Sequence, residues 1–268
     1  MISAQLAISK ARRDLTLGAI VRWAMIAAAV AALMMQPLID GAGVIGVSIL
    51  FGVGALWMVL SFRSMRGSRV AADSSTFIAA GQFELAERSI AEALDSFSIF
   101  RSVKLLSLHH LAALRHAQNR WQDSALLCQA VLMQKPRTTS GLDRSSRLLL
   151  ADSLLELGDL RGVHENLVRL YNQRLTLREA LNLLVVQQDY LARISAWEPM
   201  LWQVNTKVQM AELLPTLQSA RTQALMALAA KNTGRLDWFD WLRKRVELLI
   251  DVQHLCADRP MLSELWKQ

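Results

Sequence analysis

The sequence predicts an all-α protein in which an N-terminal transmembrane helical hairpin precedes an α-solenoid of about five helical hairpins. Three observations support this fold class. Two long uncharged segments lie near the N-terminus, amphipathic segments recur at a near-constant interval after Val70, and the 268 residues include only 12 Gly and 5 Pro. A hydrophobic share of 53% and a mean hydropathy of +0.23 are high for a chain dissolved in water, which indicates contact with a membrane.

The uncharged segments cover residues 23–39 and 44–62, and a spanning helix needs about 20 apolar residues. Between them lie only Asp40, Gly41 and their neighbours, with Pro37 shortly before, so the chain must return in a tight antiparallel turn. We therefore expect a two-helix transmembrane hairpin. A cleaved signal peptide is the alternative for the first segment, but no small-x-small cleavage site follows it.

The predicted hairpin divides the chain into three parts. Residues 1–16 form a basic N-terminal segment, residues 17–62 the hairpin, and residues 63–268 the helical-repeat domain. Basic residues flank the hairpin on both sides, while its turn carries only an aspartate: Lys10, Arg12, Arg13 and Arg22 precede it, and Arg63, Arg66 and Arg69 follow it. The positive-inside rule then predicts a bacterial-type inner membrane protein with both termini in the cytoplasm.

Small residues recur four apart in both expected spans, at Ala24, Ala28 and Ala32 and at Ser48 and Gly52. Such residues let helix backbones approach closely. We interpret them as the contact between the two helices of the hairpin. An oligomerisation face for a second copy of the chain is the alternative.

After Val70 a turn-forming residue stands two positions before a large apolar residue in three segments that resemble one another. The pairs are Gly81 with Phe83, Asn119 with Trp121, and Gly158 with Leu160, at intervals of 38 and 39 residues. Continuing this interval leads to the neighbourhood of Ala196 and then to Gly234. A single helical hairpin cannot bury its apolar face alone, so the repeats are expected to stack in series.

These segments resemble tetratricopeptide repeats, whose pattern places a Gly before an aromatic residue and Ala at fixed later positions. The first hairpin matches at Gly81, Phe83, Ala86, Ala93 and Leu94; the second at Leu108, Leu111, Ala112, Trp121, Leu132 and Pro136; the third at Leu150, Ala151, Gly158 and Leu160. The fourth and fifth hairpins match loosely. The period exceeds the usual 34 residues, so we expect longer helices than the family has.

The resemblance implies a concave groove that binds another protein. Its register places nine residues on that groove: Ala71, Ser75, Ile78, His109, Ala113, His116, Leu148, Asp152 and Glu156. The Lys and Asn set with which some family members hold a C-terminal carboxylate is lacking here. A partner recognised through apolar or mixed contacts is therefore expected.

Four tryptophans near the C-terminus offer a second surface. Trp238 and Trp241 share a helix face with Arg245 and form a candidate docking patch, because Trp and Arg are enriched where proteins bind each other. We favour packing of Trp197, Trp202, Trp238 and Trp241 between repeats, where each buries a large apolar area, and the docking patch is the alternative. The residues from Leu242 to Gln268 are expected to close the stack.

The sequence favours no catalytic site, no metal site and no cofactor. It lacks GxxxxGK[ST], GxGxxG, GxSxG and HExxH, and Cys128 and Cys256 have no partner spacing. The net charge of +7 is scattered, so no nucleic-acid interface is expected. The expected partners are a protein, the lipid bilayer, and a membrane complex or second copy. We expect an adaptor or assembly factor; the alternative is a non-catalytic accessory subunit of a membrane enzyme or transporter.

Overall fold

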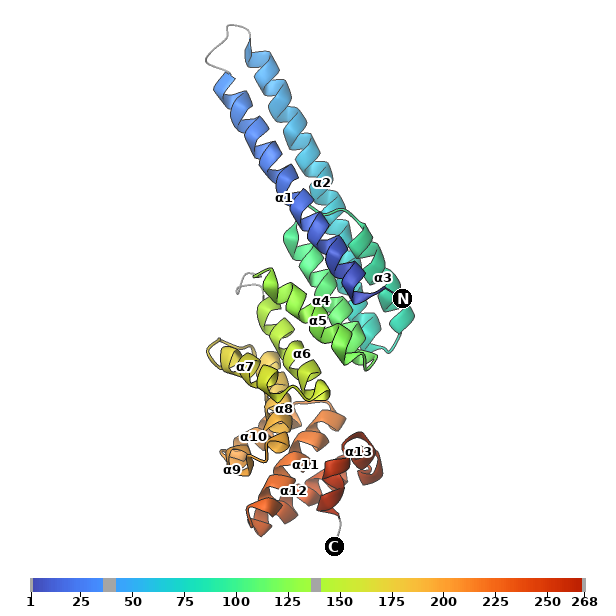
Figure 1. Ribbon diagram of the computed structural model, residues 1–268, viewed down its shortest axis with the longest axis vertical. Coiled ribbons are helices and arrows are strands. Elements are labelled where there is room, and N and C mark those ends of the chain that lie inside the picture. The colour runs from blue at the N-terminus through green and yellow to red at the C-terminus, as the bar shows by residue number, and fades with distance from the viewer. Residues whose placement is uncertain (1, 36–41, 136–140, 267–268) are drawn as a thin grey trace. The chain divides into compact units, whose positions relative to one another are not determined.

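The computed structural model describes residues 2–35, 42–135 and 141–266, and none of these residues lies in a strand (Figure 1). An all-helical chain is therefore confirmed for the described part. Pro37, Asp40, Gly41 and Pro136 lie outside the described residues. The chain divides into two compact units, Met1–Leu149 and Leu150–Gln268, and each is described by itself.

The first unit begins with two long antiparallel helices, α1 (Ala4–Met35) and α2 (Ala42–Ala79), which lie side by side in Figure 1. They have 32 and 38 residues. At a rise of 1.5 Å per residue they extend roughly 48 and 57 Å, beyond the approximately 30 Å of a bilayer core. Both are long and apolar enough to cross a membrane.

Neither helix is interrupted at the borders expected from the sequence. Residues 4–16 form the first turns of α1, and α2 continues past residue 62 to Ala79. Residues 4–16 are thus part of the same helix as the first apolar segment, and α2 carries the second apolar segment on into residues 63–79. The physical reason is that nothing around residues 16 and 62 breaks a helix, since both borders lack Pro and Gly67 is tolerated within α2.

Most exposed large apolar side chains of this pair gather in the half that contains Met35 and Ala42. Apart from Leu6 and Met65, they lie between residues 17 and 34 of α1 and between residues 47 and 62 of α2, and include Trp23, Phe51 and Phe62. A monomeric soluble protein seldom exposes so large an apolar surface. These segments coincide with the expected spans.

Most buried positions on α1, and those on α2 after residue 62, are three, four or seven residues apart. On α1 they are Ala4, Ala7, Ile8, Ala11, Asp14, Gly18, Met25 and Ala32; on α2 they are Gly46, Ser64, Gly67, Ala71 and Ser74. This is the spacing of a coiled-coil seam, and its residues are mostly small. Of the residues expected at the hairpin contact, Ala32 is buried, Ala28 is partly buried, and Ala24, Ser48 and Gly52 are exposed.

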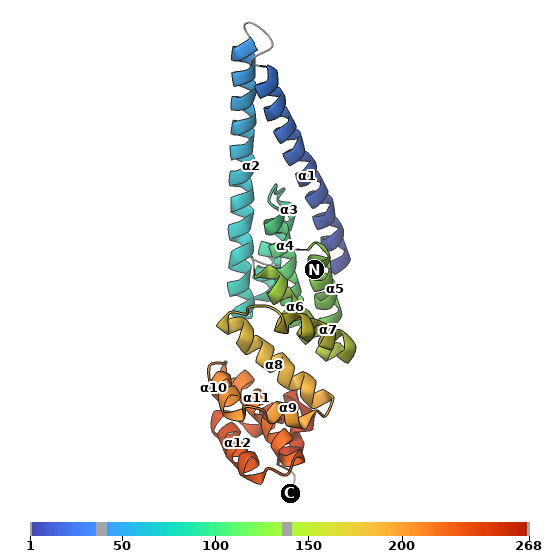
Figure 2. The ribbon, with the colours of Figure 1, turned by 90° about the vertical axis from the view of Figure 1, so that its left-hand side faces the viewer.

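The remaining helices of the first unit are α3 (Phe83–Asp95), α4 (Arg101–Ala117), α5 (Trp121–Met133) and the start of α6 (Leu142–Leu157). In Figure 2 α1 and α2 diverge toward their lower ends, and α3 and α4 lie between these ends. Helix α4 is the centre of this unit, because Leu105, Leu108, Leu111 and Leu114 are all buried on it.

The second unit contains the end of α6 followed by eight further elements. These are α7 (Leu160–Tyr171), α8 (Leu177–Arg193), α9 (Trp197–Leu201), α10 (Val204–Glu212), α11 (Thr216–Asn232), α12 (Leu236–Leu249), α13 (Val252–Asp258) and the 3₁₀ helix η2 (Pro260–Leu265). Helix α11 is buried on nearly all sides. The tail packs into the same core through Leu255, Leu262 and Leu265.

Five helices end in the same left-handed turn. The left-handed residues are Gly81, Asn119, Gly158, Ser195 and Gly234, with φ between 55° and 78°. In each turn the next residue donates its N–H to the carbonyl five positions back, as in Gln82 to Phe77 (2.9 Å) and Arg235 to Ala230 (2.9 Å). This is the Schellman arrangement, which satisfies the last carbonyls of a helix.

The next helix begins two residues after the left-handed position every time, at Phe83, Trp121, Leu160, Trp197 and Leu236. Successive left-handed residues are 38, 39, 37 and 39 positions apart. The expected turns at Gly81, Asn119, Gly158 and Gly234 are confirmed, and the fourth falls on Ser195, next to Ala196. The second helix of the fourth pair is split, since Gln203 adopts φ 53° between α9 and α10.

Candidate functional site

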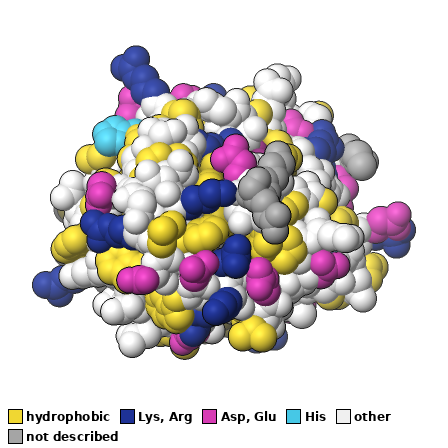
Figure 3. All heavy atoms as spheres, turned by 90° about the horizontal axis from the view of Figure 1, so that it is seen from below, with side chains coloured by type: hydrophobic (Ala, Val, Ile, Leu, Met, Phe, Trp, Pro, Cys, Tyr) yellow, Lys and Arg dark blue, Asp and Glu magenta, His cyan; other side chains and the backbone are white. Residues whose placement is uncertain are grey.

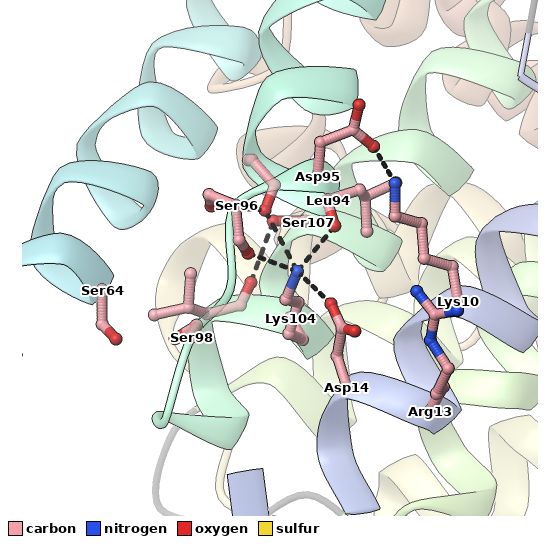
Figure 4. Close-up of polar contacts among 12 residues, drawn as sticks. Lys10, Arg13, Asp14, Ser64, Leu94, Asp95, Ser96, Ser98, Lys104 and Ser107 are labelled. Carbon is pink, nitrogen blue, oxygen red and sulfur yellow. Dashed lines mark hydrogen bonds and ion pairs between the residues drawn. The ribbon is translucent and has the colours of Figure 1, made fainter. Parts of the chain in front are cut away.

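The most constrained polar site of the first unit lies where α1 meets α3 and α4, and we call it the anchor–repeat junction. At its centre the fully buried ammonium of Lys104 lies 2.7 Å from the Asp14 carboxylate of α1. The same ammonium donates to the carbonyls of Leu94 (2.6 Å) and Ser96 (2.6 Å) at the end of α3 (Figure 4). Lys104 of α4 thus contacts both α1 and α3, and its ammonium caps the C-terminal end of α3.

Burial lowers the pKa of Lys104, and the hydrogen bond and charge of Asp14 oppose this effect. An isolated ammonium would not be stable in such a place, so the carboxylate and carbonyls are what keep it charged. Lys10, one turn before Asp14 on α1, pairs with Asp95 at the end of α3. Two ion pairs therefore hold α1 to α3 and α4.

A second buried charge completes the junction near the beginning of α1. The guanidinium of Arg115 donates to the Ile2 carbonyl (2.6 Å) and to Glu87 of α3 (2.9 Å), and the Ile2 N–H donates to Glu87 (2.6 Å). Burial alone would raise the pKa of Glu87, but the hydrogen bonds from Arg115 and Ile2 outweigh it and lower the pKa. The start of the chain is thereby fixed against α3 and α4.

The connection between α3 and α4 passes between α1 and α2. Its Ile99 is buried and donates its N–H to Ser64 of α2 (3.1 Å). A Cβ at Gly18 of α1 would lie 3.2 Å from the Ser98 carbonyl, and one at Gly67 of α2 would lie 2.8 Å from the Ser96 hydroxyl. The missing side chains of the two glycines are therefore what lets this loop fit between the long helices.

Sequence reasoning did not identify this junction. Its signal is a charge at a position where an apolar residue is expected: Lys104, Leu108, Leu111 and Arg115 are spaced four, three and four residues apart on one face of α4. Asp14 likewise interrupts the small-residue seam of α1. Charged residues are almost never fully buried unless they are paired, so each of these positions predicts a buried partner.

The nine residues expected to line a groove have different surroundings. In the first unit Ala71 and Leu148 are buried, Ser75 is exposed, and Ile78 and Ala113 are partly exposed. His116 lies with its ring edge-on to Trp121, 4.7 Å between centroids. Asp152 and Glu156 belong to the second unit and are partly exposed. Buried side chains such as Ala71 and Leu148 support helix packing and are not available to a partner.

His109 and the adjacent His110 connect neighbouring first helices of the pairs. His109 Nδ1 lies 3.0 Å from the Ser146 hydroxyl of α6, and His110 Nδ1 lies 2.6 Å from the Ala71 carbonyl of α2. Burial lowers the pKa of His109 to about 4, with a smaller contribution from His110. Both rings are therefore neutral near pH 7. Their role in the structure is to hold α2, α4 and α6 together.

Glu156 takes part in an ion-pair network inside the second unit. Its carboxylate pairs with Arg259 of the C-terminal tail and with Arg193 of α8 (3.5 Å). Asp189, which is 1% exposed, pairs with Arg221 of α11 and with Arg259 (3.2 Å). Three guanidinium groups thus surround two carboxylates from different helices. The network fastens the tail to α6, α8 and α11.

The residues of the candidate docking patch lie on α12, and each is engaged within the unit. Trp238 is partly buried under Arg235 (4.8 Å to the ring centroid), and Trp241 is 37% exposed under Arg245 (5.5 Å). Arg245 also donates to Gln223 (2.9 Å). Figure 3 shows a face of the molecule on which basic and acidic side chains are interspersed. The exposed edge of Trp241 is the accessible part of this patch.

No group of three His, Cys, Asp or Glu side chains able to hold a metal ion occurs within residues 2–35, 42–135 and 141–266. Cys128 is buried, and burial raises the pKa of its thiol far above the usual range. Comparisons with protein-family models, with curated proteins and with solved structures found no match. The contacts of the first unit connect two long apolar helices to the helices that follow them.

Proposed function

We propose that this chain is a membrane-anchored, TPR-like adaptor or assembly factor that binds another protein through its helical-repeat surface. The observation that carries the proposal is the series of five equivalent left-handed turns, 37 to 39 residues apart, that begins directly on the second long apolar helix. Repeats of this kind form extended binding surfaces. A hairpin in the bilayer would raise the effective concentration of the repeats near membrane partners.

The proposed location is a bacterial-type inner membrane with both termini in the cytoplasm. Exposed apolar side chains on residues 17–34 and 47–62 support insertion, and the arginines below them support the orientation. Resistance of the chain to alkaline carbonate extraction tests insertion. A reporter fused after Gln268 tests orientation, and its activity on the outer side of the membrane would contradict the proposal.

Site-specific photocrosslinking in native membranes tests partner binding. A photoreactive residue is placed at Ser75 or Ala113, on the first helices of their pairs, and in matched controls at the exposed Arg88 or Leu126, on second helices. We expect a discrete crosslinked protein from Ser75 and Ala113 and none from the two controls. Equal crosslinking from both sets, or none from either, would contradict a binding surface on the first helices.

One observation favours the alternative role as an accessory subunit of a membrane enzyme or transporter. Helix α1 is no passive tether, because Asp14 and Lys10 bind its lower half to α3 and α4. In that role the spans themselves contact the partner. Replacing residues 23–34 and 47–60 by an unrelated apolar hairpin then abolishes association, whereas an adaptor retains its partner.

A further inference from the structure

A group of arginines lies around the lower edge of the exposed apolar faces of the two long helices. We call it the arginine belt, and it consists of Arg12, Arg13, Arg22, Arg63, Arg69 and Arg101. Five of them are exposed and Arg22 is partly exposed. They come from α1, α2 and the first residue of α4.

The contacts between helices set the level of the belt. Gly18 of α1 and Ser64 of α2 touch the same Ser98–Ile99 segment from opposite sides, so these two positions lie at one level. Arg63 is adjacent to that level, and Arg22 lies about one helical turn, roughly 6 Å, nearer the apolar end. Arg13 and Arg69 each lie five residues, about 7 to 8 Å, on the other side. Long arginine side chains extend this reach toward an interface.

The belt has no neutralising carboxylates among the described residues. Asp14 is the one acidic residue of α1, and it is committed to Lys104. Asp73 is the one acidic residue of α2 and lies a further turn below Arg69. Arg22 donates to the Gly18 carbonyl (3.2 Å) and Arg101 to the Gln134 amide oxygen (3.5 Å), so their charges stay uncompensated. In Figure 4 Arg13 lies beside Lys10 and makes no marked contact with Asp14 or Asp95.

Aromatic side chains mark the same boundary. Trp23 is 71% exposed and directly follows Arg22. Trp57 is partly exposed and lies edge-on to Phe100, with ring centroids 6.5 Å apart, next to Arg101. Tryptophan is enriched at the level of lipid headgroups. An uncompensated positive ring under an apolar surface, with tryptophans between the two, fits one chemistry: the phosphate groups of anionic lipids.

We infer that the arginine belt binds anionic phospholipid headgroups on the cytoplasmic side and concentrates these lipids around the hairpin. This inference rests on the proposed membrane insertion but goes beyond it, since insertion alone needs no particular lipid. A basic residue close to an anionic membrane surface strengthens binding by about fivefold. The attraction is screened by salt over a Debye length of about 8 Å at physiological ionic strength.

The test compares the full chain with the variant Arg13→Gln/Arg63→Gln/Arg69→Gln and with a control variant, Arg88→Gln/Arg174→Gln/Arg178→Gln. The control removes the same charge from exposed arginines outside α1 and α2. Each protein is reconstituted into phosphatidylcholine vesicles that contain one fifth phosphatidylglycerol. It is then extracted together with its surrounding lipids in nanodiscs of styrene–maleic acid copolymer. Mass spectrometry then measures the retained lipids.

For the natural chain and the control we expect phosphatidylglycerol enriched at least about threefold over the bulk vesicle, falling in high salt. The belt variant should retain lipids at the bulk ratio. Equal enrichment in the belt variant, or equal loss in the control, overturns the inference. Flotation with pure phosphatidylcholine vesicles tests insertion separately: a chain that floats but shows no enrichment refutes the belt alone, and one that does not float refutes the membrane anchor.

Discussion

The Asp14 carboxylate of α1 lies 2.7 Å from the fully buried ammonium of Lys104 on α4, and this pair joins an apolar helix to the central helix of the first unit. Its partners are separated by 90 positions in the sequence, so it forms only when the fold is complete. Single substitutions at Asp14 and Lys104 therefore measure how much this ion pair stabilises the first unit.

Asp14→Asn should destabilise the first unit by about 3 kcal/mol, because it leaves a buried ammonium without its counter-charge. Lys104→Met should have a similar or smaller effect, since the Asp14 carboxylate then loses its partner. The double variant Asp14→Asn/Lys104→Met should recover a large part of the loss, because neither charge is then left buried without its partner. Denaturant unfolding of the purified protein in detergent measures this, and strictly additive effects of the two single changes would contradict the coupling.

The left-handed turns respond in opposite directions to two kinds of substitution. Gly158→Ala and Gly234→Ala should each lower the free energy of unfolding by about 1 to 2 kcal/mol, because φ is 78° and 72° at these positions. A Cβ added at either position has no neighbour within 4 Å, so the loss comes from the backbone conformation and not from a steric clash. Asn119→Gly and Ser195→Gly relieve the same strain at φ 59° and 55°. These two should be neutral or stabilising, and a loss above 1 kcal/mol in either would be inconsistent with the turn.

Acidification should weaken the first unit through His109. Its pKa is lowered to about 4 in the folded chain from 6.5, so the unfolded chain binds more protons between these values. Stability is then complete above pH 6.5 and falls by about 2 kcal/mol on going to pH 5. His109→Gln, which keeps a polar side chain facing Ser146, should flatten this part of the stability profile, as followed by thermal unfolding at several pH values.

The two cysteines should react at very different rates with maleimides. Cys128 is fully buried with a raised pKa, whereas Cys256 is partly exposed. Reaction of the natural chain should therefore be confined to Cys256 and be lost in Cys256→Ser. If both termini are cytoplasmic, a membrane-impermeant maleimide labels spheroplasts only after the membrane is opened; labelling of closed spheroplasts would reverse the orientation.

The sequence is sufficient to predict the helical class, the two apolar segments and the turns at Gly81, Asn119, Gly158 and Gly234. These features depend on local composition and on residues that tolerate positive φ, which are visible in one dimension. The repeat interval alone predicts the fourth turn near Ala196, one residue from its observed position at Ser195. The TPR-like arrangement and the partner-binding groove stay predictions.

The anchor–repeat junction was beyond the reach of such local patterns. Lys104, Arg115, Glu87 and Asp14 each have an ordinary sequence neighbourhood, and their meaning comes from partners on other helices. The same holds for the network of Glu156, Asp189 and Arg259. Charged residues at apolar positions of a helical stripe are the one signal that would have drawn attention to them.

Helix α2 is continuous from Ala42 to Ala79, so no break separates its exposed apolar segment from the left-handed turn at Gly81. Each residue of an α-helix advances the azimuth by about 100°. Adding one alanine after Met65 would therefore rotate the residues after it by about 100° relative to Ser64, and would separate the Ser64 hydroxyl from the Ile99 N–H. The apolar part of α2 and the helix pair that α2 forms with α3 can only turn together.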